Sequence, residues 1–104
     1  MVTVTFCYRP GVSFDQDYYL NKHMALGAEI MEPMGIRRLE VQTVIGTLDG
    51  PPAPYQRKAV LWFDSLAQAQ AAMKLPLWKQ AWDDIRNYYP ETPSVVVAEA
   101  PWVK

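Results

Sequence analysis

Residues 2–24, VTVTFCYRPGVSFDQDYYLNKHM, predict a strand, a tight turn and the beginning of a helix in close succession. The first seven of these residues alternate, with Val2, Val4, Phe6 and Tyr8 on one face and threonine or cysteine on the other. Such alternation is typical of a strand with one buried face. The Pro-Gly pair that follows indicates a turn, so the chain reverses before the helix begins.

The first helix is expected to begin at Ser13. Ser13 and Gln16 have the spacing of a capping box, in which two side chains satisfy free backbone N–H groups at the helix start. The helix should run to about Met31, because Pro33 and Gly35 are typical of a helix end.

The remaining sequence predicts three more strands and a second helical region. Ser65 and Gln68 repeat the capping-box spacing, and Pro76 is placed to restart the helix in its first turn. Apolar residues then recur at helical spacing at Trp78, Ala81, Trp82, Ile85 and Tyr89. The predicted strands are residues 36–48, 57–63 and 94–100.

The order strand, helix, strand, strand, helix, strand is the ferredoxin-like βαββαβ pattern of an α+β protein. We therefore predict a four-stranded antiparallel sheet with the helices on one face. With 104 residues and no linker, the chain should form a single domain over residues 1–104.

Two of the predicted strands are apolar on both faces, at AVLWF (residues 59–63) and VVVA (residues 95–98). Helices on one side of the sheet would leave the other apolar face exposed, which is unusual for a monomer. A second copy packed face to face would cover it. We therefore expect a homodimer of the α+β barrel type.

Composition and charge point away from several classes of partner. The formal net charge is −1 and there is no basic block, so we expect no nucleic-acid binding. From the alternating N-terminal sequence we expect neither a signal peptide nor a membrane span, and the single cysteine, Cys7, cannot form an internal disulfide. We expect a cytoplasmic protein in which Cys7 is a small structural thiol, because nothing near it in the sequence would activate a nucleophile.

His23 is the only histidine, and a helical wheel places it within the apolar arc of the first helix, one turn after Tyr19 and beside Gly27. We therefore expect His23 to face the sheet and to need a hydrogen-bond partner, because an unpaired buried imidazole costs about 1–3 kcal/mol. Its role is structural unless a cavity adjoins it, in which case it is the best proton carrier available. Gly27 either allows close packing or leaves space for a ligand.

The other candidate chemistries have weaker support. No carboxylates or histidines cluster at metal spacing, and we interpret Asp83 and Asp84 as a solvated stretch of helix. Haem could use His23 as a single axial ligand, but nothing else in the sequence indicates a large cavity. No nucleotide or flavin fingerprint is present, so we expect no cofactor.

FDQDYYLNKHMAL, residues 14–26, resembles the first-helix signature of the EthD-like family, which is named from an ethyl tert-butyl ether degradation cluster. The matching positions are Phe14, Asp15 or Asp17, Tyr18, Tyr19, His23, Met24 and Leu26. Ala25 differs from the proline that the family often has. The resemblance implies a dimeric α+β barrel with a ligand cleft between helices and sheet. Relatives of this fold include monooxygenases, isomerases, decarboxylases and haem-binding proteins, so the reaction stays open.

The leading hypothesis is therefore a cofactor-free enzyme that isomerises, decarboxylates or oxygenates a hydrophobic ring compound. His23 would be the acid or base, and Tyr19 would orient it or donate a hydrogen bond. Ligand contacts are expected from Tyr18, Gly27, Trp62 and Trp82, while other aromatics such as Trp78, Tyr88 and Tyr89 form core. The alternatives are a non-catalytic carrier of a hydrophobic metabolite and an interaction module in which His23 is structural.

Overall fold

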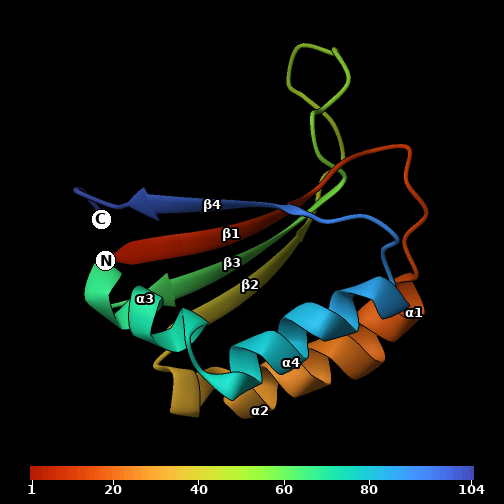
Figure 1. Ribbon diagram of the computed structural model, residues 1–104. Helices are drawn as coiled ribbons and strands as arrows, with labels where there is room; N and C mark the ends of the chain where they lie inside the picture. Colours follow the sequence, from red (N-terminus) through yellow and green to blue (C-terminus); the bar gives the residue numbers. More distant parts are fainter.

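The computed structural model describes residues 1–104 and has the predicted ferredoxin-like α+β architecture (Figure 1). The first helical region is continuous, with a π-helical turn (Tyr19–His23) between two α-helical parts. A short 3₁₀ turn (Ile85–Asn87) continues the last α-helix. The elements in chain order are β1 (Val2–Tyr8), α1 (Gln16–Tyr18), α2 (Met24–Met34), β2 (Arg38–Thr43), β3 (Arg57–Phe63), α3 (Leu66–Met73), α4 (Pro76–Asp84) and β4 (Ser94–Glu99).

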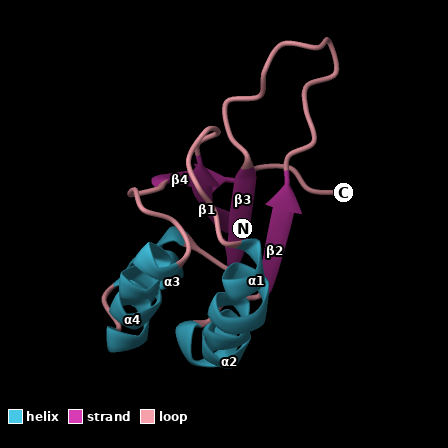
Figure 2. Cartoon of the chain, turned by 90° about the vertical axis from the view of Figure 1, so that its right-hand side faces the viewer, coloured by secondary structure: helices cyan, strands magenta, loops and turns pink.

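The four strands form one antiparallel sheet in the order β2-β3-β1-β4, and the helices lie on one side of it (Figures 1 and 2). The register places Val4 of β1 opposite Leu61 of β3 and Val97 of β4. These paired residues share a face, and we call the face toward the helices the inner face. The outer face carries the alternate residues, which include Thr3, Thr5, Val60, Trp62 and Val96.

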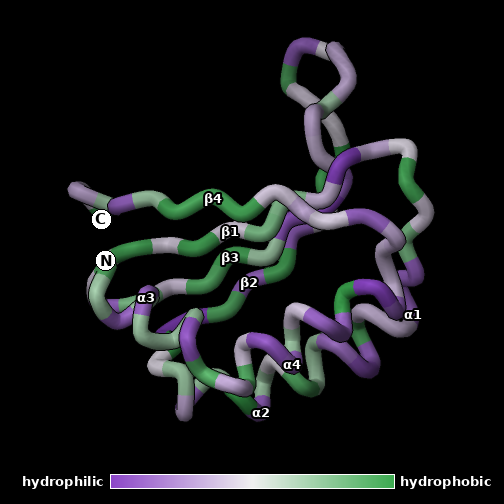
Figure 3. Tube along the Cα trace, in the orientation of Figure 1, coloured by the Kyte–Doolittle hydropathy of each residue, from purple (hydrophilic) through white to green (hydrophobic).

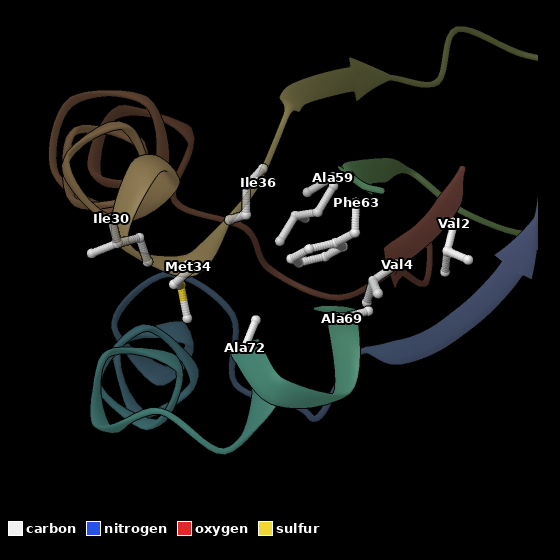
Figure 4. Packing of buried hydrophobic residues seen from close by; sticks show 10 residues of the cluster. Val2, Val4, Ile30, Met34, Ile36, Ala59, Phe63, Ala69 and Ala72 are labelled. Carbon is white, nitrogen blue, oxygen red and sulfur yellow. The ribbon is translucent and has the colours of Figure 1, made fainter. Parts of the chain in front are cut away.

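The main hydrophobic core lies between the inner face and helices α2 and α3 (Figure 4). Val4 and Phe63 from the sheet and Ala69 from α3 are fully buried there, and Met34 of α2 reaches the same layer. Figure 3 shows apolar residues along the strands of the sheet. The alternating residues of β1 thus point where the sequence pattern predicted.

The first helix differs from the prediction at both ends. It is capped by Asp15, whose carboxylate accepts a hydrogen bond from the Tyr18 N–H at 3.0 Å, and Ser13 does not cap it. A carboxylate at this position also complements the positive helix N-terminus, so Asp15 caps it well. The helix continues through Pro33 and ends at Gly35, which adopts the left-handed conformation with φ 74°.

Other element boundaries are partly as predicted. β2 ends at Thr43 and is shorter than predicted, because residues 44–56 form a loop that projects beyond the sheet (Figure 1). Ser65 caps α3 by accepting from the Gln68 N–H at 3.2 Å. The Gln68 side chain instead donates to the Met34 carbonyl, so only half of that capping box forms. Pro76 begins α4 as predicted.

The helices cover β1 and β3 but leave β4 uncovered. Val95 and Val97 lie on the inner face of β4, yet 37% and 47% of their surfaces stay exposed. Val96, on the outer face, is 47% exposed. Figure 1 shows β4 at the edge of the sheet away from α2 and α4. No helix of the chain combines the length and the apolar character needed to cross a membrane.

Candidate functional site

A cavity lies between the inner face of the sheet and helices α2 and α4. Its interior measures about 60 Å³, and the hollow including its open mouth about 520 Å³. The interior has room for on the order of four water molecules, so a ring compound would also occupy part of the open mouth. The walls are apolar side chains from both layers, among them Phe6, Leu61, Trp78 and Trp82.

His23 contributes to this apolar wall. Of the 15 lining residues 13 are hydrophobic, and the remaining two are His23 and Gly27. The imidazole is 14% exposed, which confirms that it faces inward. It ends the π-helical turn, in which the Met24 N–H bonds to the Tyr19 carbonyl five residues earlier. Such π-turns change the angle at which side chains leave a helix and are frequent at functional sites.

Asp84, at the end of α4, is the main partner of His23. Its Oδ2 lies 2.8 Å from His23 Nδ1, and its Oδ1 accepts hydrogen bonds from the Tyr18 hydroxyl at 2.6 Å and the Asn87 amide at 2.9 Å. Burial alone would raise the pKa of Asp84, but these hydrogen bonds outweigh it and hold the pKa below its usual value. Asp84 is therefore a carboxylate held by three donors, and the interpretation of Asp84 as solvated helix surface was wrong.

Two tyrosines extend the arrangement on the other side of the ring. The Tyr88 hydroxyl lies 3.3 Å from His23 Nε2 and 2.6 Å from the Tyr8 hydroxyl. Both tyrosines are buried, with 3% and 1% of their surfaces exposed. Because the Asp84 carboxylate can only accept, His23 Nδ1 carries the proton of the neutral ring and Nε2 accepts from Tyr88. The Tyr8 hydroxyl then donates to the Tyr88 oxygen.

This environment controls the charge of the imidazole. Burial lowers the pKa of His23 below its ordinary value, and Asp84 opposes that shift through its hydrogen bond and its charge. His23 is therefore neutral near pH 7 but faces a carboxylate that stabilises the imidazolium once a proton arrives. A carboxylate–histidine pair beside an apolar cavity can take up and return a proton.

Tyr19 lies beside His23 without bonding to it. The two rings stack, with centroids 5.7 Å apart and planes 14° from parallel. The Tyr19 hydroxyl is buried with no hydrogen-bond partner. Burial raises the pKa of Tyr19 to about 12, against the opposing charge of Arg57. Tyr19 thus packs against the imidazole, and the tyrosine hydrogen bond to His23 comes from Tyr88.

The predicted ligand-binding residues are not all at the cavity. Gly27 and Trp82 line it, and 36% of the Trp82 surface is exposed. Tyr18 does not line it but holds Asp84. Trp62 lies elsewhere, because it pairs with Thr3 and so belongs to the outer face of the sheet.

Neither a metal cluster nor an activated thiol adds to this arrangement. No three histidine, cysteine, aspartate or glutamate side chains come together in a geometry that could hold a metal ion. Burial raises the pKa of the Cys7 thiol, partly opposed by Lys58. Cys7 lies on the outer face, away from His23.

Several solved structures share this fold, and three of them are compared with this chain. An EthD-like protein from Ralstonia eutropha JMP134 superposes with a TM-score of 0.78 at 22% identity, covering 99% of this chain and 94% of that one. An EthD family protein from Bacillus halodurans C-125 superposes with a TM-score of 0.73 at 18% identity, and the match covers 95% of this chain and 96% of that one. A dimeric ferredoxin-like protein of unknown function from Jannaschia sp. CCS1 superposes with a TM-score of 0.70 at 11% identity, and the match covers 95% of this chain and 98% of that one.

No curated protein sequence matches this chain. At these identities the structural likeness shows the fold alone. The family model for the EthD domain, however, matches residues 10–91, which is most of the chain. The matched residues include the first helix, α4, and His23, Asp84 and Tyr88, while Tyr8 lies just before them. The protein therefore belongs to the EthD family.

Proposed function

We propose that the cavity binds a small hydrophobic ring compound with a carbonyl or hydroxyl group, and that His23 takes up and returns a proton during its conversion. The observation that carries the proposal is the 2.8 Å contact between His23 and the Asp84 carboxylate at the wall of an apolar cavity. A structural histidine needs a partner but no adjoining space, whereas here the pair borders a cavity.

The proposed chemistry is removal of a proton next to a carbonyl or from a ring hydroxyl. The electrons of the broken bond move onto the ligand oxygen, and the proton is held on His23 as an imidazolium beside Asp84. The resulting enolate-type anion can isomerise, decarboxylate or react with oxygen, so several outcomes share this step. Proton transfer by a positioned histidine contributes typically 10²–10⁴-fold to such rates.

The other predicted residues have supporting roles in this proposal. Gly27 leaves space in the cavity wall, and the partly exposed Trp82 would contact the ring from the opposite helix. Tyr18 positions the carboxylate of Asp84. Tyr19 keeps the plane of the imidazole fixed by stacking on it. None of these roles requires a cofactor.

One observation favours a second candidate function, that of a carrier. Both nitrogens of His23 already have partners within the protein, Asp84 and Tyr88. A protein that only sequesters a hydrophobic metabolite needs the apolar walls but no proton transfer. Tight binding of a compound without turnover would favour this function.

The second copy expected from the sequence is also part of the proposal. The outer face presents Val60, Trp62 and Val96, and β4 is uncovered by any helix. A ferredoxin-like neighbour of this chain is described as dimeric. We therefore propose an isologous homodimer through the outer faces of the two sheets, with Trp62 in the interface.

A panel of lactones, quinols and aromatic acids tests the enzymatic function. Wild-type protein should convert at least one of them, and His23→Gln, His23→Ala and Asp84→Asn should each lower kcat/KM by at least tenfold. Asp83→Asn is the matched control, because Asp83 pairs with Lys79 on the surface and does not touch His23. Turnover that is unchanged in both His23 variants would contradict the proposal.

A further inference from the structure

The hydroxyl and imidazole groups near the cavity form one continuous hydrogen-bonded chain. It runs from Tyr8 through Tyr88 and His23 to Asp84, with separations of 2.6, 3.3 and 2.8 Å between the bonded atoms. Tyr8 comes from β1, His23 from the first helix and Asp84 from the end of α4, while Tyr88 directly follows the 3₁₀ turn. Segments up to 80 positions apart in sequence thus supply one chain of groups.

The chain meets the cavity at two places. Tyr8 and His23 both line the cavity, whereas Tyr88, which links them, does not. Both imidazole nitrogens of His23 already face protein partners. A ligand that exchanged a proton directly with His23 would have to displace Tyr88 from Nε2. The Tyr8 hydroxyl, in contrast, uses its own proton toward Tyr88 and keeps lone-pair capacity free.

We propose that Tyr8 is the residue that contacts the reacting oxygen of the ligand, and that Tyr88 relays the proton between Tyr8 and His23. The ligand class is then a ring compound that presents a hydroxyl, either a phenol or the enol form of a ring carbonyl compound. This inference rests on the proposed function, because it specifies how a proton reaches His23.

The transfer balances without any co-reactant. The ligand O–H bond breaks and its proton binds to the Tyr8 oxygen, while the former Tyr8 proton moves to Tyr88 and the former Tyr88 proton forms a bond to His23 Nε2. The ligand oxygen becomes negative and the imidazole becomes positive, beside the Asp84 carboxylate. The reverse sequence returns the proton, so the protein is unchanged after one cycle.

The direction of the chain depends on where the proton is. With neutral His23, every hydroxyl donates toward Nε2, and Tyr8 offers the ligand an acceptor. With protonated His23, Nε2 donates to Tyr88, Tyr88 donates to Tyr8, and the Tyr8 proton points to the ligand. Tyr8 thus stabilises a hydroxyl before transfer and an oxyanion after it, which is the differential interaction that catalysis requires.

The surroundings favour transfer through neutral hydroxyls. Burial is the main reason that the pKa values of Tyr8 and Tyr88 lie far above that of a free phenol, so neither carries a negative charge at rest. The charged groups around the chain are Asp84, beside His23, and Arg57, whose guanidinium lies 4.5 Å from the centroid of the Phe14 ring and acts on Tyr19.

NMR of ¹⁵N-histidine-labelled protein tests this relay. Because His23 is the single histidine, all imidazole signals of the protein come from it. The probe is phenol, one ring with one hydroxyl. In wild-type protein, neutral His23 should carry its proton on Nδ1, and phenol should shift the Nε2 signal. Tyr88→Phe should abolish that shift while phenol still binds. Tyr8→Phe should abolish it and raise the Kd for phenol by about tenfold, because one hydrogen bond is lost.

Tyr55→Phe is the matched control and should behave like wild type, because Tyr55 lies in the 44–56 loop outside the cavity. An equal Nε2 shift in Tyr88→Phe would show direct contact with His23 and overturn the relay. Phenol that fails to bind at millimolar concentration, or binds Tyr8→Phe as well as wild type, would overturn the role of Tyr8. If Tyr8→Phe does not fold, the Tyr88→Phe comparison decides the relay alone.

The proposed function can fail or stand separately from this inference. The NMR measurement needs no turnover, so an inactive protein can still show the hydrogen-bonded chain. Turnover that His23→Gln abolishes but Tyr8→Phe and Tyr88→Phe retain would contradict the relay and leave the acid–base function standing.

Discussion

His23 Nδ1 lies 2.8 Å from Asp84 Oδ2, although the two residues are 61 positions apart in the sequence. The contact joins the π-helical turn of the first helix to the last residue of α4. The carboxylate decides which imidazole nitrogen carries the proton, and so leaves Nε2 as the acceptor on the Tyr88 side. The pair therefore sets both the orientation and the charge state of His23 at the cavity.

Replacing Asp84 by asparagine should lower the pKa of His23 further. The carboxylate opposes the effect of burial through its hydrogen bond and its charge, and asparagine removes the charge. A titration of the His23 ring signals by NMR measures the change. Asp83→Asn should leave the titration as it is in wild type, and a downward change of equal size in both variants would assign the effect to net charge alone.

His23 should also make the folded state less stable as the pH falls below about 6.5. The unfolded chain takes up the imidazole proton near that pH, whereas the folded protein does so only at lower pH because burial lowers the pKa. The unfolded state then binds more protons, so the free energy of unfolding decreases by at most about 1.4 kcal/mol per pH unit. Carboxylates add their own losses only at more acidic pH.

Urea unfolding at pH 7.5 and pH 5.5 measures this effect. Wild-type protein should lose more stability between the two pH values than His23→Gln, which has no group that titrates there. Equal losses in the two proteins would show that His23 makes no contribution to the pH dependence.

Gly27→Ala should narrow the cavity without unfolding the protein. A methyl group there would lie 3.3 Å from Leu39 Cδ2 and 3.6 Å from Met24 Cε, so Leu39 has to shift slightly. Alanine is more favourable than glycine inside a helix by up to about 1 kcal/mol, and this gain offsets the cost of the close contact with Leu39. We expect a change of stability within about 1 kcal/mol in thermal unfolding, together with at least threefold weaker phenol binding. Unchanged phenol affinity would place the ligand away from Gly27.

Val96→Glu should convert the proposed dimer into a monomer. Val96 lies on the outer face of β4 and is 47% exposed in the single chain, and a buried glutamate in the interface would be unpaired. Light scattering at micromolar concentration measures the mass. Leu20→Glu is the matched control, because Leu20 is 48% exposed on the helical side of the molecule. A wild-type monomer, or dissociation by both substitutions, would contradict an interface through the outer face.

The fold followed from local patterns, because alternation and capping residues act over a few positions. The alternating residues of β1 fixed its buried face, and the helical wheel placed His23 inward. The error at the first helix had a local cause as well. Ser13 and Asp15 are both good caps, and spacing alone could not decide between them.

Features that depend on tertiary placement were harder to predict. Asp83 and Asp84 are chemically identical neighbours, and only the position of α4 decides which one meets His23. One signal was present, since Asp84 lies three residues after Ala81 and four before Tyr88, on the apolar side of the helix. Trp62 shows the opposite case. Both faces of β3 are apolar, so the alternation of its residues could not show whether Trp62 lies on the inner or the outer face.

The most direct test of the acid–base role is hydrogen–deuterium exchange into a cyclic β-diketone in D₂O, a ring compound that interconverts between ketone and enol. Proton NMR follows loss of the hydrogen signal at the carbon between the two carbonyl groups. Wild-type protein should accelerate the exchange above the buffer rate, and His23→Gln should lower that acceleration at least hundredfold, while Asp83→Asn retains it. Equal acceleration by wild type and His23→Gln, or binding of the diketone with no acceleration, would contradict the account.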